Sequence, residues 1–135
     1  ISQEDVKITG HAIECRINAD DPDNDFRPSP GLVTLAHFPG GEGLRVDTHI
    51  QAGASVPPFY DSMIAKVIAT GAPRDEARQR LSKAIHNTRV DGIRTNLSLH
   101  HVVLNSPEFS EGGVDTHFLG RLLSRTTDTA VQAAP

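Results

Sequence analysis

The stretch that decides the fold of this chain is residues 10–18, GHAIECRIN. Apolar and polar side chains alternate along it, and this period of two residues is typical of a β-strand with one face buried. The apolar face carries three side chains: Ile13, Cys15 and Ile17. We therefore expect a strand that packs these residues into the core and turns its other face outward.

The outward face sets a carboxylate, a guanidinium and an amide in one row, at Glu14, Arg16 and Asn18. Neighbours in the row lie about 6–7 Å apart because a strand rises ~3.3 Å per residue. One interpretation is an ordinary exposed sheet face on which an arginine lies beside a glutamate. The other is an arginine on a rigid element that is directed at an anion, since its planar fork binds two oxygens at once. Periodicity alone does not choose between them.

Length and composition limit the class of protein. The 135 residues fit one domain, and the shares of hydrophobic (37%) and charged (22%) residues are ordinary for a globular chain. A net charge of −4 argues against a nucleic-acid partner, and 4% aromatic residues without Trp offer no base-stacking platform. No apolar run approaches the ~20 residues that span a bilayer. We expect a domain that binds neither nucleic acid nor membrane.

The sequence indicates neither a disulfide nor a metal site. Cys15 is the only cysteine, and its place on the apolar face predicts a small buried hydrophobe in a reducing compartment. The seven histidines include no His-x-x-x-His pair, which argues against zinc. The acidic loop at 20–25 lacks the Gly and Glu spacing of a calcium loop, so we expect a solvated turn.

The first half of the chain predicts further strands. Residues 33–38 and 44–50 read as two strands, and the glycine-rich segment 39–43 between them predicts a hairpin loop. An apolar run at 63–69 predicts another strand, which ends at Gly71.

The second half predicts helices. Apolar residues recur at helical spacing through 73–88, and acidic residues in its first turn suit the positive end of a helix. Asn96 is a predicted N-cap for a second helix, and Asp115 or Thr116 for a last one that ends near Leu123. Strands followed by helices predict an α+β fold, with an antiparallel β-sheet from the first half and helices from the second half packed on it.

Five separated motifs carry a resemblance to a known family. They are GHAIECRINA (10–19), PSPG (28–31), PPFYDSMIAK (57–66), DGIRTN (91–96) and THFL (116–119). In this order they resemble the C-terminal domain of biotin carboxylase, the component shared by acetyl-CoA, propionyl-CoA and pyruvate carboxylases. The resemblance implies such a domain at 9–123, with a connector at 1–8 and a flexible tail at 124–135.

The resemblance also implies a reaction. In that family ATP activates bicarbonate as carboxyphosphate, and biotin on a carrier domain or protein is then carboxylated at its ureido nitrogen. An ATP-grasp domain supplies the groups that bind ATP and Mg, and no motif here matches them. The chain begins with Ile1 rather than Met, which favours a piece of a longer protein. We therefore expect the C-terminal part of an ATP-dependent, C–N bond-forming ligase that is inactive by itself.

Four site residues follow from the resemblance. Arg16 matches the arginine that meets bicarbonate and the ureido oxygen of biotin, so it is the expected catalytic residue. Asp61 matches an acidic position that would orient the fork of Arg16. Thr116 and His117 match a segment near the adenine end of the nucleotide site. No metal ligand is expected in this chain.

The expected partners are the ATP-grasp domain of the same parent chain and a biotin carboxyl carrier domain or protein. A homodimer is implied by Arg45, because its segment helps to form the interface in bacterial members. Glu42 stands where that family is often aromatic, which weakens this expectation. The cytoplasm is the expected compartment, or the mitochondrial matrix in a eukaryote, and acetyl-CoA carboxylase in fatty acid biosynthesis is one setting.

Two alternatives of other classes stay open. The first is a non-catalytic interaction module that binds a biotin carrier or a partner subunit. The second is a small independent nucleotide-binding protein, although the chain has no loop that would cradle a phosphate.

Overall fold

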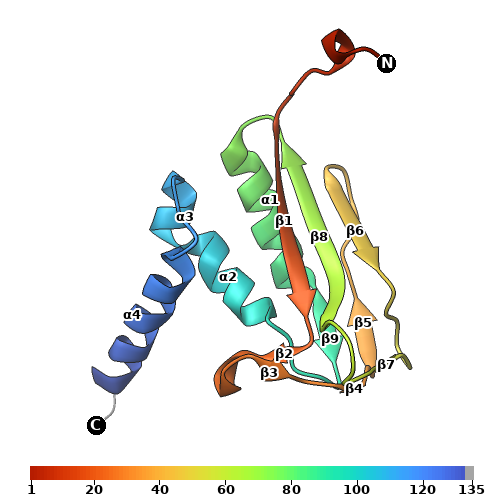
Figure 1. Ribbon diagram of the computed structural model, residues 1–135, viewed down its shortest axis with the longest axis vertical. Coiled ribbons are helices and arrows are strands. Elements are labelled where there is room, and N and C mark those ends of the chain that lie inside the picture. The colour runs from red at the N-terminus through yellow and green to blue at the C-terminus, as the bar shows by residue number, and fades with distance from the viewer. Residues whose placement is uncertain (133–135) are drawn as a thin grey trace.

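A three-stranded antiparallel sheet forms the centre of the molecule (Figure 1). The structure, a computed structural model, describes residues 1–132, with side chains described as far as Arg125. The strands are β1 (His11–Asn18), β8 (Met63–Gly71) and β6 (Leu44–Thr48), in the order β1-β8-β6. Because β8 lies between the other two, both of its edges are paired, whereas β1 keeps one edge free of strands.

Short antiparallel ladders and two 3-10 turns make up the rest of the strand-rich half. The ladders pair β2 (Asp20–Asp21) with β3 (Arg27–Pro28), β4 (Gly31–Leu32) with β7 (Ser55–Val56), and β5 (Leu35–His37) with β9 (Arg89–Asp91). The turns are η1 (Gln3–Asp5) and η2 (Pro22–Asn24).

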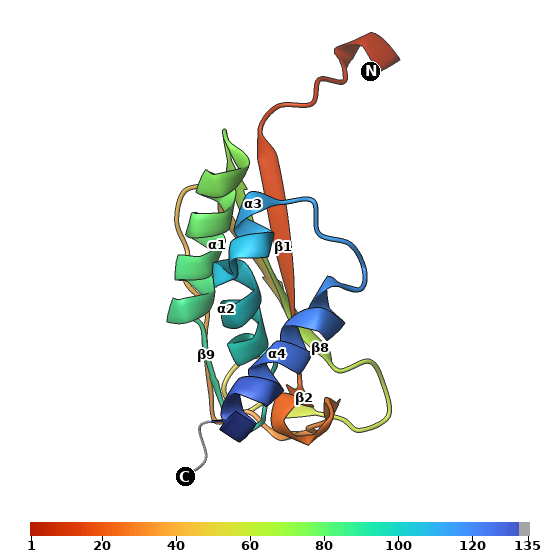
Figure 2. The ribbon, with the colours of Figure 1, turned by 90° about the vertical axis from the view of Figure 1, so that its left-hand side faces the viewer.

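Helices pack on one face of the sheet and beside its β1 edge (Figure 2). They are α1 (Arg74–Asn87), α2 (Leu97–Asn105), α3 (Pro107–Glu111) and α4 (Phe118–Gln132). α1 packs against β8 and β1 through the predicted apolar face, and its residues there are buried: Ala77, Leu81, Ala84, Ile85 and the following Thr88. The helical period in the sequence therefore identified the correct face of α1.

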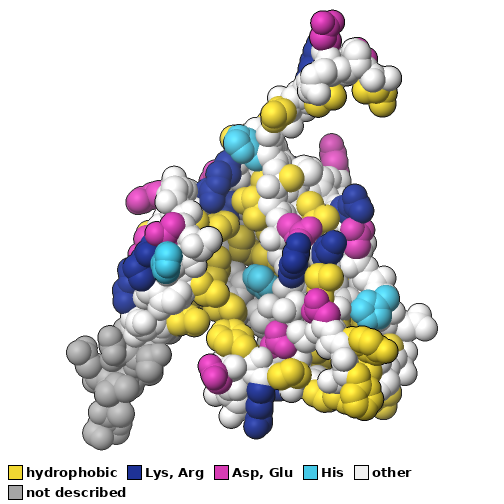
Figure 3. Space-filling model, in the orientation of Figure 1, with side chains coloured by type: hydrophobic (Ala, Val, Ile, Leu, Met, Phe, Trp, Pro, Cys, Tyr) yellow, Lys and Arg dark blue, Asp and Glu magenta, His cyan; other side chains and the backbone are white. Residues whose placement is uncertain are grey.

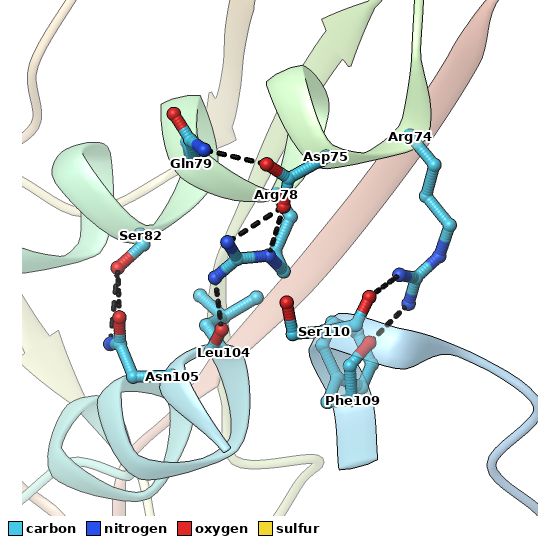
Figure 4. A network of polar contacts seen from close by, with 9 residues as sticks. All are labelled: Arg74, Asp75, Arg78, Gln79, Ser82, Leu104, Asn105, Phe109 and Ser110. Atoms are coloured by element: carbon cyan, nitrogen blue, oxygen red, sulfur yellow. Dashed lines mark hydrogen bonds and ion pairs between the residues drawn. The ribbon is translucent and has the colours of Figure 1, made fainter. Parts of the chain in front are cut away.

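Two arginines of α1 attach the following helices to it (Figure 4). Arg78 donates to the carbonyl of Leu104 in the last turn of α2 at 2.9 Å. Arg74 donates to the carbonyls of Phe109 and Ser110 in α3 at 2.8 and 3.1 Å. The last carbonyls of a helix have no partner within the helix, so these guanidinium groups satisfy them and join three helices.

The predicted hairpin at 39–43 does not form. β5 and β6 flank this segment, yet β6 pairs with β8 and β5 pairs with β9. Gly92 explains the second pairing, because a Cβ built there would lie 2.1 Å from the carbonyl oxygen of Leu32. Only glycine lets the chain after β9 approach so closely, and Thr34 N–H then donates to the carbonyl of Asp91 at 2.9 Å.

The second half holds more elements than the sequence predicted. α3 and β9 were not expected, and α4 continues to Gln132 rather than ending near Leu123. The region predicted as a tail, 124–135, is thus helical as far as Gln132, and its last three residues lie outside the described part of the chain.

The arrangement confirms the α+β class, with helices packed on an antiparallel sheet. Residues 1–8, the expected connector, are exposed and extend away from the sheet (Figure 1). Through Gln132, none of the helices has the length and apolar character required to cross a bilayer.

Candidate functional site

Charged side chains gather over the middle of the open sheet face, as Figure 3 shows. Arg16 of β1 lies opposite Lys66 of β8, and Lys66 lies opposite Asp47 of β6. The other face of β1 points into the core, where Cys15 is 4% and Ile17 0% exposed. The alternation in the sequence therefore predicted the buried face of β1 and the exposure of Glu14 and Arg16 correctly. Asn18 differs, because it is half-buried and its Oδ1 is enclosed without a hydrogen-bond partner among the described residues.

Arg16 and Lys66 form a pair of cations on neighbouring strands. Directly opposite positions in an antiparallel ladder place their Cβ atoms about 4.5–5.5 Å apart, and like charges there repel each other. Carboxylates offset part of this repulsion, because Glu14 pairs with Arg16 and Asp47 lies opposite Lys66 on its other side. The two adjacent cations can still attract an anion to the exposed side of Arg16. The sequence had not singled out Lys66, because the register of β1 on β8 is visible only in the folded chain.

The Arg16 guanidinium is open to solvent on its outer side. Its Nε lies 3.0 Å from Oε1 of Glu14, and the Arg16 side chain is 69% exposed. Among the described residues its two terminal nitrogens make no hydrogen bond. An exposed ion pair of this kind contributes about 0–1 kcal/mol to stability. The fork is thus oriented by Glu14 and free to bind two oxygens of a ligand.

Asp61 does not contact Arg16 in this structure. Its Oδ1 accepts the backbone N–H of Met63 at 2.9 Å, and it lies in the exposed loop that carries Phe59 and Tyr60. Glu14 is the carboxylate that meets the guanidinium. The predicted orienting role of Asp61 therefore stays a prediction for the assembled protein.

Asn96, the residue before α2, and His100 within α2 hold the backbone of β1 at its free edge. The Asn96 amide donates to the carbonyl of Arg16 at 3.1 Å and accepts from the N–H of Asn18 at 2.9 Å. His100 Nε2 lies 2.8 Å from the same Arg16 carbonyl. The sequence identified Asn96 as the N-cap residue, but its side chain bonds β1 rather than its own helix. Its spacing of four from His100 places both on one helix face, while nothing in the sequence names the strand they meet.

The remaining predicted residues lie apart from this contact set. Arg45 of β6 makes two hydrogen bonds with Asp47, at 2.9 and 2.8 Å, and these lower the pKa of the Asp47 carboxyl. Thr116 and His117 are exposed in the turn before α4, where His117 N–H donates to Asp115 at 3.1 Å.

Cys15 is buried beneath the site. Burial, aided by the charge of Glu14, raises the pKa of its thiol from 9.0 to about 12, so the group is a protonated thiol at neutral pH. This agrees with its prediction as a buried hydrophobe. Within the described residues, no group of three or more His, Cys, Asp or Glu side chains could hold a metal ion.

Comparison with known proteins gives one family. A scan of family models matches residues 14–121 to the biotin carboxylase C-terminal domain. The chain is 54% identical over 123 residues to the biotin carboxylase of Pseudomonas aeruginosa, covering 91% of this chain and 27% of that protein. It therefore spans about a quarter of the length of the curated relatives it matches.

Solved structures give the same result. The biotin carboxylase subunit of a pyruvate carboxylase aligns with a TM-score of 0.89 and 40% identity, over 92% of this chain and 28% of that one. The biotin carboxylase domain dimer of Hydrogenobacter thermophilus 2-oxoglutarate carboxylase, solved with MgADP, ADP and bicarbonate, aligns with a TM-score of 0.87 and 36% identity. That match covers 90% of this chain and 27% of the other.

Proposed function

Because this chain belongs to the biotin carboxylase C-terminal domain family, we propose that it forms the C-terminal domain of a biotin carboxylase. In this role it completes the site where biotin on a carrier is carboxylated with bicarbonate and ATP. The observation that carries the proposal is the cation pair of Arg16 and Lys66 on an exposed, rigid sheet face. This pair fits an anionic substrate, and a related domain was solved with bicarbonate.

Arg16 is the proposed catalytic residue. Removal of the ureido proton of biotin builds negative charge on the ureido oxygen, and a guanidinium already fixed beside that oxygen stabilises the charge as it develops. The two terminal nitrogens of Arg16 make no hydrogen bond among the described residues. They can therefore bind the ureido oxygen without first breaking a contact within the protein. Lys66, opposite on β8, adds a second positive charge that attracts bicarbonate.

ATP and Mg are proposed to be bound mainly by another domain of the parent protein. Within the described residues, no cluster of His, Cys, Asp or Glu could hold a metal ion, and the metal ligands are proposed to come from that other domain. We assign Thr116 and His117 to the nucleotide-facing side of the domain, with Arg45 at a homodimer interface. The further partners are an ATP-grasp domain in the same chain and a biotin carrier, in a cytoplasmic or mitochondrial carboxylase.

The test is ATP- and bicarbonate-dependent carboxylation of biotin by the longer protein that contains this domain. Arg16→Ala should lower kcat by about 10²–10³-fold, because it removes one donor to the developing oxyanion. Arg16→Lys should restore little, since a point charge does not reproduce a bidentate fork.

Arg89→Ala is the matched control. Arg89 also lies on a strand and pairs with a carboxylate two residues away, Asp91, at 2.8 Å, with 70% of its side chain exposed. Its loss should leave kcat unchanged. Near-normal carboxylation by Arg16→Ala, or a loss that follows only from unfolding, would refute the proposed function.

A further inference from the structure

The free edge of β1 is covered by a helix at the position of Arg16. β1 pairs with β8 alone, so the N–H and C=O groups of alternate residues point away from the sheet along its other edge. At Arg16 and Asn18 these outward groups bond to Asn96, the residue before α2, and to His100 within α2. The helix therefore occupies the position that a fourth strand would have next to Arg16.

Asn96 makes the contacts that such a strand would make. Its Oδ1 accepts the N–H of Asn18, its Nδ2 donates to the carbonyl of Arg16, and its backbone N–H donates to the carbonyl of Asn18 at 3.2 Å. Asn96 is 8% exposed, so water does not compete strongly for these three bonds.

His100 adds a second donor to the Arg16 carbonyl. A carbonyl oxygen can only accept, so Nε2 must carry the hydrogen, and this determines the tautomer of the ring. Burial lowers the pKa of His100 below its usual value, and the ring is therefore neutral at pH 7. The carbonyl of Arg16 thus receives two neutral donors from one face of α2.

The register of the sheet explains why this support is needed. The pairing of β1 with β8 shifts between Ile17 and Asn18, one residue beyond Arg16. A bulge of this kind changes the direction of a strand, so β8 alone does not hold both sides of the shift in line. Asn96 contacts Arg16 on one side of the shift and Asn18 on the other.

We propose that Asn96 and His100 are positioning residues that set the backbone, and with it the guanidinium, of Arg16. This inference rests on the proposed role of Arg16. Because the Arg16 side chain is mostly exposed and, among the described residues, forms an ion pair with Glu14 alone, its reach to a substrate oxygen is determined mainly by where its Cα lies. A displacement of about 1 Å at a reacting group can cost as much as 10²-fold in rate.

The experiment compares two substitutions at His100 that differ by one methylene. The amide nitrogen of Gln reaches the place of Nε2, whereas that of Asn falls short of the Arg16 carbonyl. In the full-length carboxylase, His100→Asn should lower kcat for biotin carboxylation about tenfold with an unchanged KM for ATP. His100→Gln should restore kcat.

His101→Asn is the control for the helix itself. His101 is the next residue of α2, is exposed, and lies beside His86 on α1, with the two rings tilted by 40°. This variant should keep wild-type kcat, with melting temperatures measured for all three proteins.

The outcomes separate this inference from the proposed function. If Arg16→Ala keeps its activity, the proposed function fails. If Arg16→Ala is inactive but His100→Asn is normal, or His100→Gln does not restore kcat, the positioning role is wrong. If His100→Asn unfolds and His101→Asn does not, the hydrogen bond from His100 to the Arg16 carbonyl contributes to stability alone. That result would also overturn the inference.

Discussion

Gly92→Ala should lower the free energy of unfolding more than Gly→Ala does at a glycine that also has a positive φ but has no atoms close to the added Cβ. Gly92 has φ +97°, and a Cβ there would lie 2.1 Å from the Leu32 carbonyl oxygen and 2.9 Å from the Thr34 nitrogen. Both obstacles are backbone atoms, which cannot rotate away. A positive φ costs a residue with a Cβ about 1–2 kcal/mol, and forced backbone shifts in a packed region cost about 1–3 kcal/mol more.

The control is Gly53→Ala. Gly53 has φ +88°, and nothing lies within 4 Å of the Cβ that alanine would add. It should therefore lose only the conformational part, about 1–2 kcal/mol. Urea unfolding of both variants, followed by circular dichroism, gives the two free energies of unfolding. We expect Gly92→Ala to be less stable than Gly53→Ala by about 1–3 kcal/mol. Equal stability of the two variants would refute the argument that Gly92 is required for the approach of β9 to β5.

The other predictions concern the core of the sheet and the helix contacts. Cys15 should resist alkylation by iodoacetamide in the native protein at pH 8 and react on unfolding, because burial raises its pKa to about 12. Because the thiol pKa is higher in the folded protein than its unfolded value of 9.0, the contribution of Cys15 to stability is complete below pH 9.0 and is lost as the pH rises towards about 12. The free energy of unfolding should therefore fall less steeply with alkaline pH in Cys15→Ala than in the wild type. Arg78→Ala should lower the free energy of unfolding by about 1–3 kcal/mol, since it leaves the Leu104 carbonyl without its donor. Arg89→Ala should cost less than about 1 kcal/mol by the same measurement, and equal losses for the two arginines would contradict the helix-end interpretation of Arg78.

Local periodicity was enough to predict the main elements. Alternation placed Cys15 and Ile17 inside and Arg16 outside, and helical spacing identified the buried face of α1. These predictions succeed because burial of one face is a local property of a strand or helix, repeated every two or every three to four residues. The order of the elements likewise predicted the α+β class.

Pairing between strands was not predictable in the same way. The segment 39–43 has hairpin composition, yet β5 pairs with β9 from the far end of α1. Composition shows that a turn is allowed, whereas the choice of partner depends on long-range packing. The close approach at Gly92, directly after β9, permits the pairing with the distant strand.

The sequence by itself determined which residues face outward on β1, and the motifs around Arg16 indicated the family. Only the tertiary structure decided what surrounds Arg16. Lys66 comes opposite it through the register of β8. Asn96 and His100 reach its carbonyl from the start of α2, some eighty residues away along the chain. The physical reason is that hydrogen bonds and charge pairs act over a few ångströms of space. A one-dimensional pattern records which side chains can make such contacts, and only the folded chain selects the partners.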